Sequence, residues 1–319
     1  MELVVNVFIF IIGLAVLIFS ADILIQSCVK ISLLFRLTPL FIGIIFVAFG
    51  TSLPEAGVGI VAALRNQKDI ALGNIIGSNI ANIGLILGLC SMFYSLKVNK
   101  SILRRELPIM LVAAVLFYLL SLDLLLSRFD GIIFIFSFLI FLFISYQGAR
   151  KNFCEKEIQN FPFKKWFEKI KSPFILPVVI FLSLIGIVGG ADLMVRGGAN
   201  LAKILGISTW IIGIVVFAIG TSLPELVASL VASFKKVPAI SIGNIVGSNI
   251  FNILFVLGIV SLIRPINLQF SLLKFEYPVM FLFSVFLSFI LRNCQISKKE
   301  GVGLFLGYFL FIFLLLNKK

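Results

Sequence analysis

Histidine is absent from this chain of 319 residues, and only 14 residues are acidic. Without histidine, the base that usually activates the nucleophile of a serine hydrolase is missing, which argues against that class of enzyme. The four cysteines, at positions 28, 90, 154 and 294, show no CxxC spacing. A disulfide framework or a zinc site is therefore not expected. We predict that the protein is not an enzyme and that it needs no cofactor.

Apolar residues, in contrast, are abundant. The chain is 61% hydrophobic, its mean hydropathy is +1.17, and it contains 35 phenylalanines. These values are typical of membrane proteins. The net charge of +13 does not indicate a nucleic-acid partner, because the basic residues lie between apolar stretches rather than on a soluble module. Such charges are typical of loops near lipid headgroups, so membrane lipid is an expected partner.

Ten apolar stretches are long enough to cross a membrane as helices. Five precede and five follow a polar segment with seven Lys or Arg residues. The chain thus divides into residues 1–148, a basic cytoplasmic linker at 149–173, and residues 174–319. Because the N-terminus has no basic n-region, we interpret the first stretch as a retained span. The predicted spans are residues 3–28, 38–63, 70–95, 106–125, 131–148, 174–202, 208–234, 240–263, 276–292 and 302–317.

The two halves repeat each other. The hexapeptide Gly-Thr-Ser-Leu-Pro-Glu at residues 50–55 returns 170 positions later at residues 220–225. The pattern Gly-Asn-x-x-Gly-Ser-Asn at residues 73–79 returns at the same offset at residues 243–249. Across residues 42–91 and their counterparts, 25 of 50 positions are identical without a gap. Repetition at this level indicates two homologous halves.

The distribution of positive charge predicts the orientation of the chain. With the N-terminus outside, the cytoplasmic loops carry 18 of the 27 basic residues, which the positive-inside rule favours. Each half holds five spans, an odd number, so the second half would cross the membrane in the opposite direction. Inverted repeats are typical of secondary transporters whose site lies near the membrane midplane. We therefore predict an all-α membrane protein with ten transmembrane helices in two inverted five-helix repeats. It would be a multi-pass protein of the cell (plasma) membrane with both termini extracellular.

The repeated motifs supply the chemistry of a cation site. Glu55 and Glu225 each lie inside an apolar span, where an acidic residue is costly and usually functional. The proline before each glutamate removes a helix hydrogen bond and loosens nearby backbone carbonyls. Carboxylate, hydroxyl, amide and carbonyl oxygens are all ligands of hard cations. Two carboxylates at close range repel unless a cation or a proton lies between them, which favours exchange over leak.

Two further acidic residues, Asp22 and Asp192, also align at the 170-residue offset. Asp192 has Arg196 one helical turn further on, a spacing that predicts a local ion pair. Asp22 has only Gln26 at that spacing.

The doubled motif resembles the α-repeats of the cation/calcium exchanger superfamily, and its prokaryotic sodium/calcium exchangers in particular. The resemblance implies a secondary active antiporter that exchanges Ca²⁺ for Na⁺ by alternating access, with small inorganic cations as its partners. It implies that Glu55 and Glu225 hold Ca²⁺ together with the carbonyls of Thr51 and Thr221. The other residues that it implies, for flanking Na⁺ sites and for the centre, are Ser52, Ser222, Ser78, Ser248, Ala48, Ala218 and Asn82.

One position departs from the pattern, because several of these exchangers have an aspartate where this chain has Asn252. We keep Asn252 in the predicted site, which then contains two fixed carboxylates rather than three. The counter-ion, Na⁺ or H⁺, and the stoichiometry stay open, and H⁺/Ca²⁺ antiport is the alternative because glutamates can carry protons. A hydrolase using Ser52 or Ser222 would need a lysine base, and none lies in the motif-bearing spans. A passive channel or a scaffold would not need inverted repeats with paired broken helices. The oligomeric state is open, and a monomer is compatible with the sequence.

Overall fold

The computed structural model describes residues 2–98, 100, 102–151, 153, 161–164, 167, 174–205 and 220–317. These residues are almost entirely helical, and helices let backbone groups bond within their own segment, as hydrocarbon requires. Among the described residues, seven helices are long and apolar enough to cross a membrane, or eight if one bent pair counts as a single span. The expected all-α membrane protein is therefore confirmed. The predicted span 106–125 corresponds to a shorter apolar helix, and the predicted span 208–234 lies partly outside the described residues.

Over the described residues, the first half consists of helices joined by short loops, and several of the helices are interrupted by π-helical turns (η). Its elements are α1 (Glu2–Phe35), α2 (Pro39–Ile42), η1 (Gly43–Ala48), α3 (Phe49–Thr51), α4 (Leu53–Leu64), α5 (Lys68–Ala81), η2 (Asn82–Leu87), α6 (Gly88–Phe93), β1 (Leu96–Lys97), η3 (Ile102–Glu106), α7 (Leu107–Leu120), β2 (Leu125–Leu126) and α8 (Arg128–Lys151).

The second half follows the same order over the residues that the structure describes. Its elements are α10 (Ile175–Ile204), α12 (Leu223–Phe234), α13 (Pro238–Ile250), η5 (Phe251–Val256), α14 (Leu257–Ile263), β3 (Ile266–Asn267), α15 (Phe270–Lys274), α16 (Glu276–Ile290), the 3-10 turn η6 (Leu291–Asn293), β4 (Gln295–Ile296) and α17 (Lys298–Leu316).

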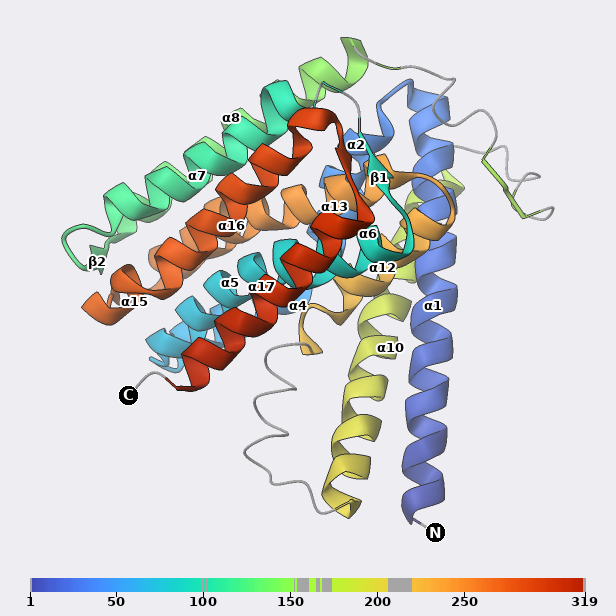
Figure 1. The fold of residues 1–319 in the computed structure, drawn as a ribbon, viewed down its shortest axis with the longest axis horizontal. Helices are drawn as coiled ribbons and strands as arrows, with labels where there is room; N and C mark the ends of the chain where they lie inside the picture. Colours follow the sequence, from blue (N-terminus) through green and yellow to red (C-terminus); the bar gives the residue numbers. More distant parts are fainter. Residues whose placement is uncertain are drawn as a thin grey trace.

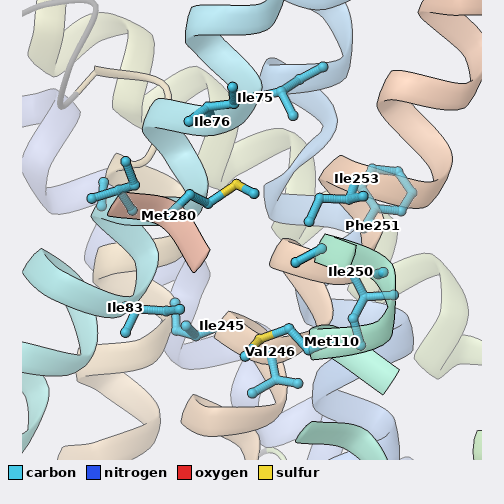
Figure 2. Close-up of a cluster of buried hydrophobic side chains, with 14 of the residues drawn as sticks. Ile75, Ile76, Ile83, Met110, Ile245, Val246, Ile250, Phe251, Ile253 and Met280 are labelled. Carbon is cyan, nitrogen blue, oxygen red and sulfur yellow. The ribbon is translucent and has the colours of Figure 1, made fainter. Parts of the chain in front are cut away.

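Two helices form the buried centre of the bundle. In the continuous segments Lys68–Phe93 and Pro238–Ile263, 83% of the most apolar stretch is buried inside the protein. The corresponding fraction is 17–28% in the other long helices, whose apolar side chains face outward as lipid contact requires. Figure 2 shows part of the core, where isoleucines of α5 and α13 lie near Met110 of α7 and Met280 of α16. Because lipid tails are as apolar as these side chains, close packing rather than exclusion of water stabilises the centre.

The helices α1 and α10 run side by side as a pair and extend beyond the rest of the bundle (Figure 1). Glycines let their backbones approach closely. A Cβ added at Gly190 would lie 2.6 Å from the backbone N of Leu17, and one at Gly13 would lie 2.8 Å from the carbonyl O of Gly190. No larger residue fits at this crossing without separating the two helices.

Contacts between the halves also repeat at the 170-residue offset. Strand β1 of the first half pairs with β4 of the second, and β2 pairs with β3, both antiparallel. The N–H of Val98 donates to the carbonyl of Cys294 over 2.9 Å, and the N–H of Leu268 donates to the carbonyl of Leu124 over 2.8 Å. Adding 170 to the number of Val98 and subtracting it from that of Cys294 gives Leu268 and Leu124, so the second contact is the first with the halves exchanged. The halves thus exchange partners as parts related by a two-fold rotation do.

Candidate ion-binding site

A break in the helix positions each glutamate of the repeated hexapeptide. Between α3 and α4 the chain turns at Ser52, and the axes of the flanking helical segments differ by 45°. Pro54 has no N–H to donate to the carbonyl of Gly50, which is why the helix cannot continue regularly. The break places Glu55 in the first turn of α4, and Glu225 likewise lies in the first turn of α12, which begins after Ser222. Unpaired N–H groups at a helix start favour negative charge there.

The two glutamates belong to one buried cluster in which each contacts a serine of the other half. The Ser52 hydroxyl lies 2.8 Å from Oε1 of Glu225 and 2.9 Å from Oγ of Ser248. In the mirrored contact, the Ser222 hydroxyl lies 3.5 Å from Oε1 of Glu55. Both carboxylates are only 1% exposed. The hexapeptides of the two halves therefore meet in one buried cluster.

Several buried polar atoms of the predicted site residues have no hydrogen-bond partner in the described part of the chain. They include Oε2 of Glu55, Oε2 of Glu225 and Oδ1 of Asn82, and both Oδ1 and Nδ2 of Asn252. Neither glutamate forms an ion pair with a basic side chain of the described residues. Buried acceptors without donors are costly. A bound cation is a partner that would satisfy these oxygens.

The carboxylate count limits what kind of cation site this is. Among the described residues, no group of three or more His, Cys, Asp or Glu side chains lies close enough to hold a metal. Hydroxyl, amide and backbone oxygens would therefore have to complete a coordination shell around the two glutamates. Hard cations such as Na⁺ and Ca²⁺ are coordinated by such oxygen ligands, whereas Zn²⁺ favours nitrogen and sulfur ligands.

Two asparagines of the repeated Gly-Asn-x-x-Gly-Ser-Asn pattern contact the backbone of the two glutamates. Nδ2 of Asn74 donates to the backbone carbonyl of Glu55 over 3.0 Å, and Nδ2 of Asn244 donates to that of Glu225 over 3.3 Å. Asn244 also contacts Thr51 at 3.1 Å between Oδ1 and Oγ1. Asn74 and Asn244 are not among the predicted site residues named above, although their doubling in the motif indicated a role at the site.

π-helical turns lie beside the asparagines of the predicted site. Asn82 begins η2, and Asn252 is the second residue of η5. Such turns are rare and frequently occur at functional sites. The Nδ2 of Asn82 donates to Oδ1 of Asn249 over 3.0 Å, and Nδ2 of Asn249 donates to the carbonyl of Asn79 over 3.3 Å. These amides join the central helices α5 and α13 across the middle of the protein.

The structure describes all but one of the predicted site residues. Those that lie buried are Ala48, Thr51, Ser52, Glu55, Ser78, Asn82, Ser222, Glu225, Ser248 and Asn252, and Thr221 is partly exposed. Ala218 lies outside the described residues. The carbonyl of Ala48 accepts from the N–H of Ser52 over 3.0 Å and lies 3.4 Å from the hydroxyl of Thr51. An ion bound there would share this carbonyl with those donors.

Close packing also holds the serine of the second motif in place. A Cβ added at Gly247 would lie 2.8 Å from Cβ of Ala48 and 2.9 Å from Cα of Ile44. The glycine therefore lets α13 lie directly against η1. That approach brings Ser248, the next residue, to the Ser52 hydroxyl.

Comparison with known proteins agrees with this description. The family model for the sodium/calcium exchanger protein matches residues 5–147 and again residues 175–317. Over 299 residues the chain is 35% identical to the inner membrane protein YrbG of Escherichia coli (strain K12), covering 93% of this chain and 91% of that protein. It is 32% identical over 344 residues to the sodium/calcium exchanger MaX1 of Methanosarcina acetivorans, covering 98% of each.

A solved structure of the sodium-calcium exchanger NCX_Mj, soaked with zero Na⁺ and Ca²⁺, has the same fold. It matches with a TM-score of 0.84 at 28% sequence identity and covers 98% of this chain and 99% of that one. The fold and the buried pair of glutamates thus define a multi-span membrane protein with an oxygen-rich internal site. The chain belongs to the sodium/calcium exchanger protein family, which confirms the resemblance seen in its doubled motif.

Proposed function

We propose that this protein is a secondary active antiporter that exchanges Ca²⁺ for Na⁺ across the cell membrane by alternating access. The observation that carries the proposal is the buried contact between the halves, in which Ser52 reaches Glu225 and Ser222 reaches Glu55. Two buried carboxylates without basic partners need a cation to balance their charge. Membership of the sodium/calcium exchanger family supports Na⁺ and Ca²⁺ as those cations.

Ca²⁺ binds between Glu55 and Glu225 in this proposal. Ca²⁺ takes six to eight oxygen ligands, and carboxylates can bind it with both oxygens. Two bidentate glutamates and the carbonyls of Thr51 and Thr221 would supply about six. The unpartnered Oε2 atoms of both glutamates support this arrangement, because they are acceptors that the protein itself does not satisfy.

Na⁺ binds on either side of the glutamates. Ser52, Ser248 and the carbonyl of Ala48 would form one flank, and Ser222, Ser78 and the carbonyl of Ala218 the other. The short contact between Ser52 and Ser248 supports the first set. Asn82 and Asn252 would add amide oxygens at the centre, and their unpartnered Oδ1 atoms support that role.

The two halves, residues 1–148 and 174–319, cross the membrane in opposite directions in this proposal, with the linker in the cytoplasm and both termini outside. The strand pairs support that topology, because β1 and β4 belong to loops predicted inside and β2 and β3 to loops predicted outside. A two-fold axis in the membrane plane then relates the halves and passes near the site. That geometry suits a carrier that opens to each side in turn.

Charge decides what the exchange does electrically. Two carboxylates carry about −2, so one bound Ca²⁺ leaves the site neutral and three bound Na⁺ leave it at about +1. Exchange of three Na⁺ for one Ca²⁺ moves one net charge, and membrane potential would bias it by about 2.3 kcal/mol per 100 mV. Exchange of two Na⁺ or two H⁺ for one Ca²⁺ would be electrically silent. The H⁺/Ca²⁺ antiporter remains the second candidate, favoured by the absence of a third carboxylate at Asn252.

The test is Ca²⁺ uptake into proteoliposomes with a Na⁺, a K⁺ or a pH gradient imposed in turn, each with and without a clamped membrane potential. We expect uptake only with an outward Na⁺ gradient, accelerated by a positive interior because net positive charge leaves. Uptake that follows the pH gradient and ignores Na⁺ would establish H⁺/Ca²⁺ exchange instead. Uptake that needs no counter-ion gradient and follows the potential alone would indicate a channel.

A further inference from the structure

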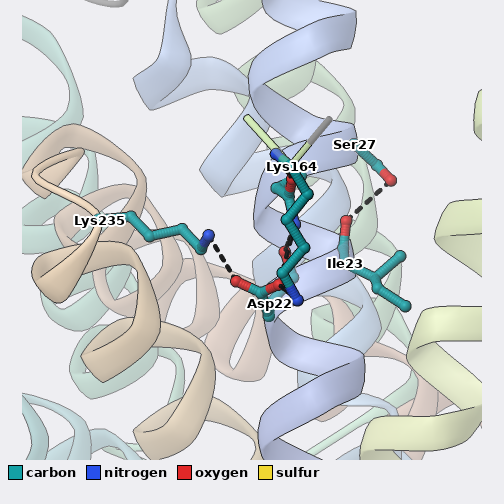
Figure 3. Close-up of polar contacts among 6 residues, drawn as sticks. Asp22, Ile23, Ser27, Lys164 and Lys235 are labelled. Carbon is teal, nitrogen blue, oxygen red and sulfur yellow. Dashed lines mark hydrogen bonds and ion pairs between the residues drawn. The ribbon is translucent and has the colours of Figure 1, made fainter. Parts of the chain in front are cut away.

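A single aspartate of α1 joins three segments of the chain (Figure 3). The carboxylate of Asp22 lies 2.5 Å from Nζ of Lys235 and 2.8 Å from Nζ of Lys164. Nε2 of Gln26 donates to it over 2.8 Å, and Oε1 of Gln26 accepts from the N–H of Lys164 over 2.9 Å. Lys235 directly follows α12, the helix whose first turn contains Glu225. Asp22 therefore ties α1 to the helix that carries one of the two site glutamates.

The equivalent residues of the other half exist but do not meet. At the 170-residue offset, Asp192 corresponds to Asp22, Arg65 to Lys235 and Arg196 to Gln26. Asp192 pairs with Arg196 over 2.9 Å and is 51% exposed. Arg65 is exposed and forms no ion pair within the part of the chain that the structure describes.

Helix packing shows the same asymmetry. Helix α1 packs along α12, whereas α10 and α4, the corresponding pair, are not packed against each other. Both helices of this second pair lie wholly within the described residues. The turns that carry the two basic residues are alike, because Asn66 and Lys236, which follow them, both have a left-handed φ of 60–61°.

We propose that Asp22–Lys235 and Asp192–Arg65 are two alternative latches, one formed in each access state of the transporter. The inference rests on the proposed alternating access between inverted halves. In such a carrier the second state is reached when the two repeats exchange their conformations around a fixed site. That exchange breaks Asp22–Lys235, forms Asp192–Arg65, and brings α10 against α4. In the structure the Asp22–Lys235 latch is closed. Lys235 lies in a loop that is predicted to be cytoplasmic, so the closed latch is on that side.

The neighbours of each aspartate suit this role. When its latch opens, Asp192 keeps Arg196 one turn away, and Asp22 keeps Gln26, so neither carboxylate is left without a polar partner. Lys164 has no counterpart, because it belongs to the linker between the repeats. Its contact with Asp22 adds a second cation to one latch only. The linker therefore favours the state in which the Lys235 side is closed.

Cysteine cross-linking tests the two latches in a background with the four native cysteines replaced. One variant carries Asp22→Cys with Lys235→Cys, and a second carries Asp192→Cys with Arg65→Cys. We expect a short bis-methanethiosulfonate reagent, which joins two thiols through disulfide bonds, to link each pair, and each link to stop Ca²⁺ flux until a reductant is added. In a variant that combines both introduced cysteine pairs, the two links should never form in the same molecule. Failure of the Asp192–Arg65 pair to link in a transporting protein, or both links in one molecule, would overturn the proposal.

Charge removal provides a second readout in the variant with cysteines at positions 22 and 235. Arg65→Gln weakens only the opposite latch, so cross-linking between positions 22 and 235 should become about two-fold faster, as expected for an exposed ion pair. Lys68→Gln, which removes a charge from the same turn, is the matched control and should change nothing. Equal effects of both substitutions would contradict a specific latch. Cross-linking needs no ion flux, so absence of Ca²⁺ transport in the parent would count against the exchange proposal and not against the latches.

Discussion

At the scale of single residues, two asparagines of the second half play opposite parts: Asn244 lies in the repeated motif and Asn252 follows it by three residues. Asn244 is saturated with contacts, to Ser229 at 2.9 Å, to Thr51 and to the carbonyl of Glu225. Asn252 is equally buried but has no partner for either polar atom of its amide. Hydrogen bonds stabilise through the partners they satisfy, and a buried polar group without partners destabilises. We infer that Asn244 stabilises the fold, and that Asn252 has the proposed role of an ion ligand.

Leucine substitutions separate these two parts. We expect Asn244→Leu to lower the free energy of unfolding by about 1–3 kcal/mol, because it removes three buried polar contacts and leaves part of their hydrogen-bonding capacity unmet. Asn252→Leu breaks no hydrogen bond and should keep or raise stability while it weakens Ca²⁺ transport. Thermal unfolding in detergent and uptake in proteoliposomes measure the two effects. Normal transport by Asn252→Leu would place that residue outside the ion site.

Aspartate at the same position tests the charge of the site. An amide can neither carry a charge nor bind a proton at physiological pH, whereas Asn252→Asp adds a group that does both. We expect Ca²⁺ transport by this variant to fall more steeply than that of the parent as the pH is lowered, because protons compete with Ca²⁺ for the added carboxylate. Uptake measured across a pH series provides the comparison. An unchanged pH profile would contradict a position for Asn252 beside the two glutamates.

At the scale of helices and strands, the sequence predicted what is local and missed what is distant. The proline breaks, the glutamates and the i,i+4 pair of Asp192 with Arg196 follow from residue type and short spacing, and the ion pair is confirmed. The ion pair between Asp22 and Lys235 joins residues far apart in the sequence, and no periodic pattern in the sequence predicts it. The π-helical turns at Asn82 and near Asn252 were also unpredictable, because they depend on packing around the helix rather than on its own residues.

The approach of α13 to η1 can be tested at Gly247. Gly247→Ala places a methyl group 2.8 Å from Cβ of Ala48, too close for either helix to stay where it is. We expect a loss of about 1–3 kcal/mol in stability and weaker transport, since Ser248 would move with the helix. Gly303→Ala is the matched control on α17, where the added carbon meets nothing within 4 Å. Equal effects at both glycines would show that helix propensity, not this contact, is responsible.

At the scale of the whole molecule, the family match and the internal contacts describe the same repetition. The family model matches twice, with starting points at residues 5 and 175, and the strand pairs and hydrogen bonds between the halves repeat at that spacing. In the proposed topology, a repeat of five spans inverts the second copy with respect to the membrane, which brings both hexapeptides to one depth. Such a plan explains how two identical motifs, 170 residues apart, build one site.

The inversion predicts on which side each motif ends. Arg65 and Lys235 occupy equivalent turns after the two hexapeptides, so they should face opposite sides of the membrane, with Arg65 outside. Single cysteines at these positions, in a background without native cysteines, can be labelled with a membrane-impermeant thiol reagent in intact and in permeabilised cells. Labelling of both positions from the same side would rule out inverted repeats.

The measurement that tests the account most directly is Na⁺-driven Ca²⁺ uptake by Glu55→Gln and Glu225→Gln beside the parent. Each change removes one of the two buried charges that would face the divalent ion, while the amide keeps the size of the side chain. Asp69→Asn, an exposed carboxylate at the start of α5, is the control. We expect uptake to be lost in both glutamine variants, with the fold retained, and to continue in the control. Uptake at the parental rate by either glutamine variant would contradict a Ca²⁺ site shared between the two halves.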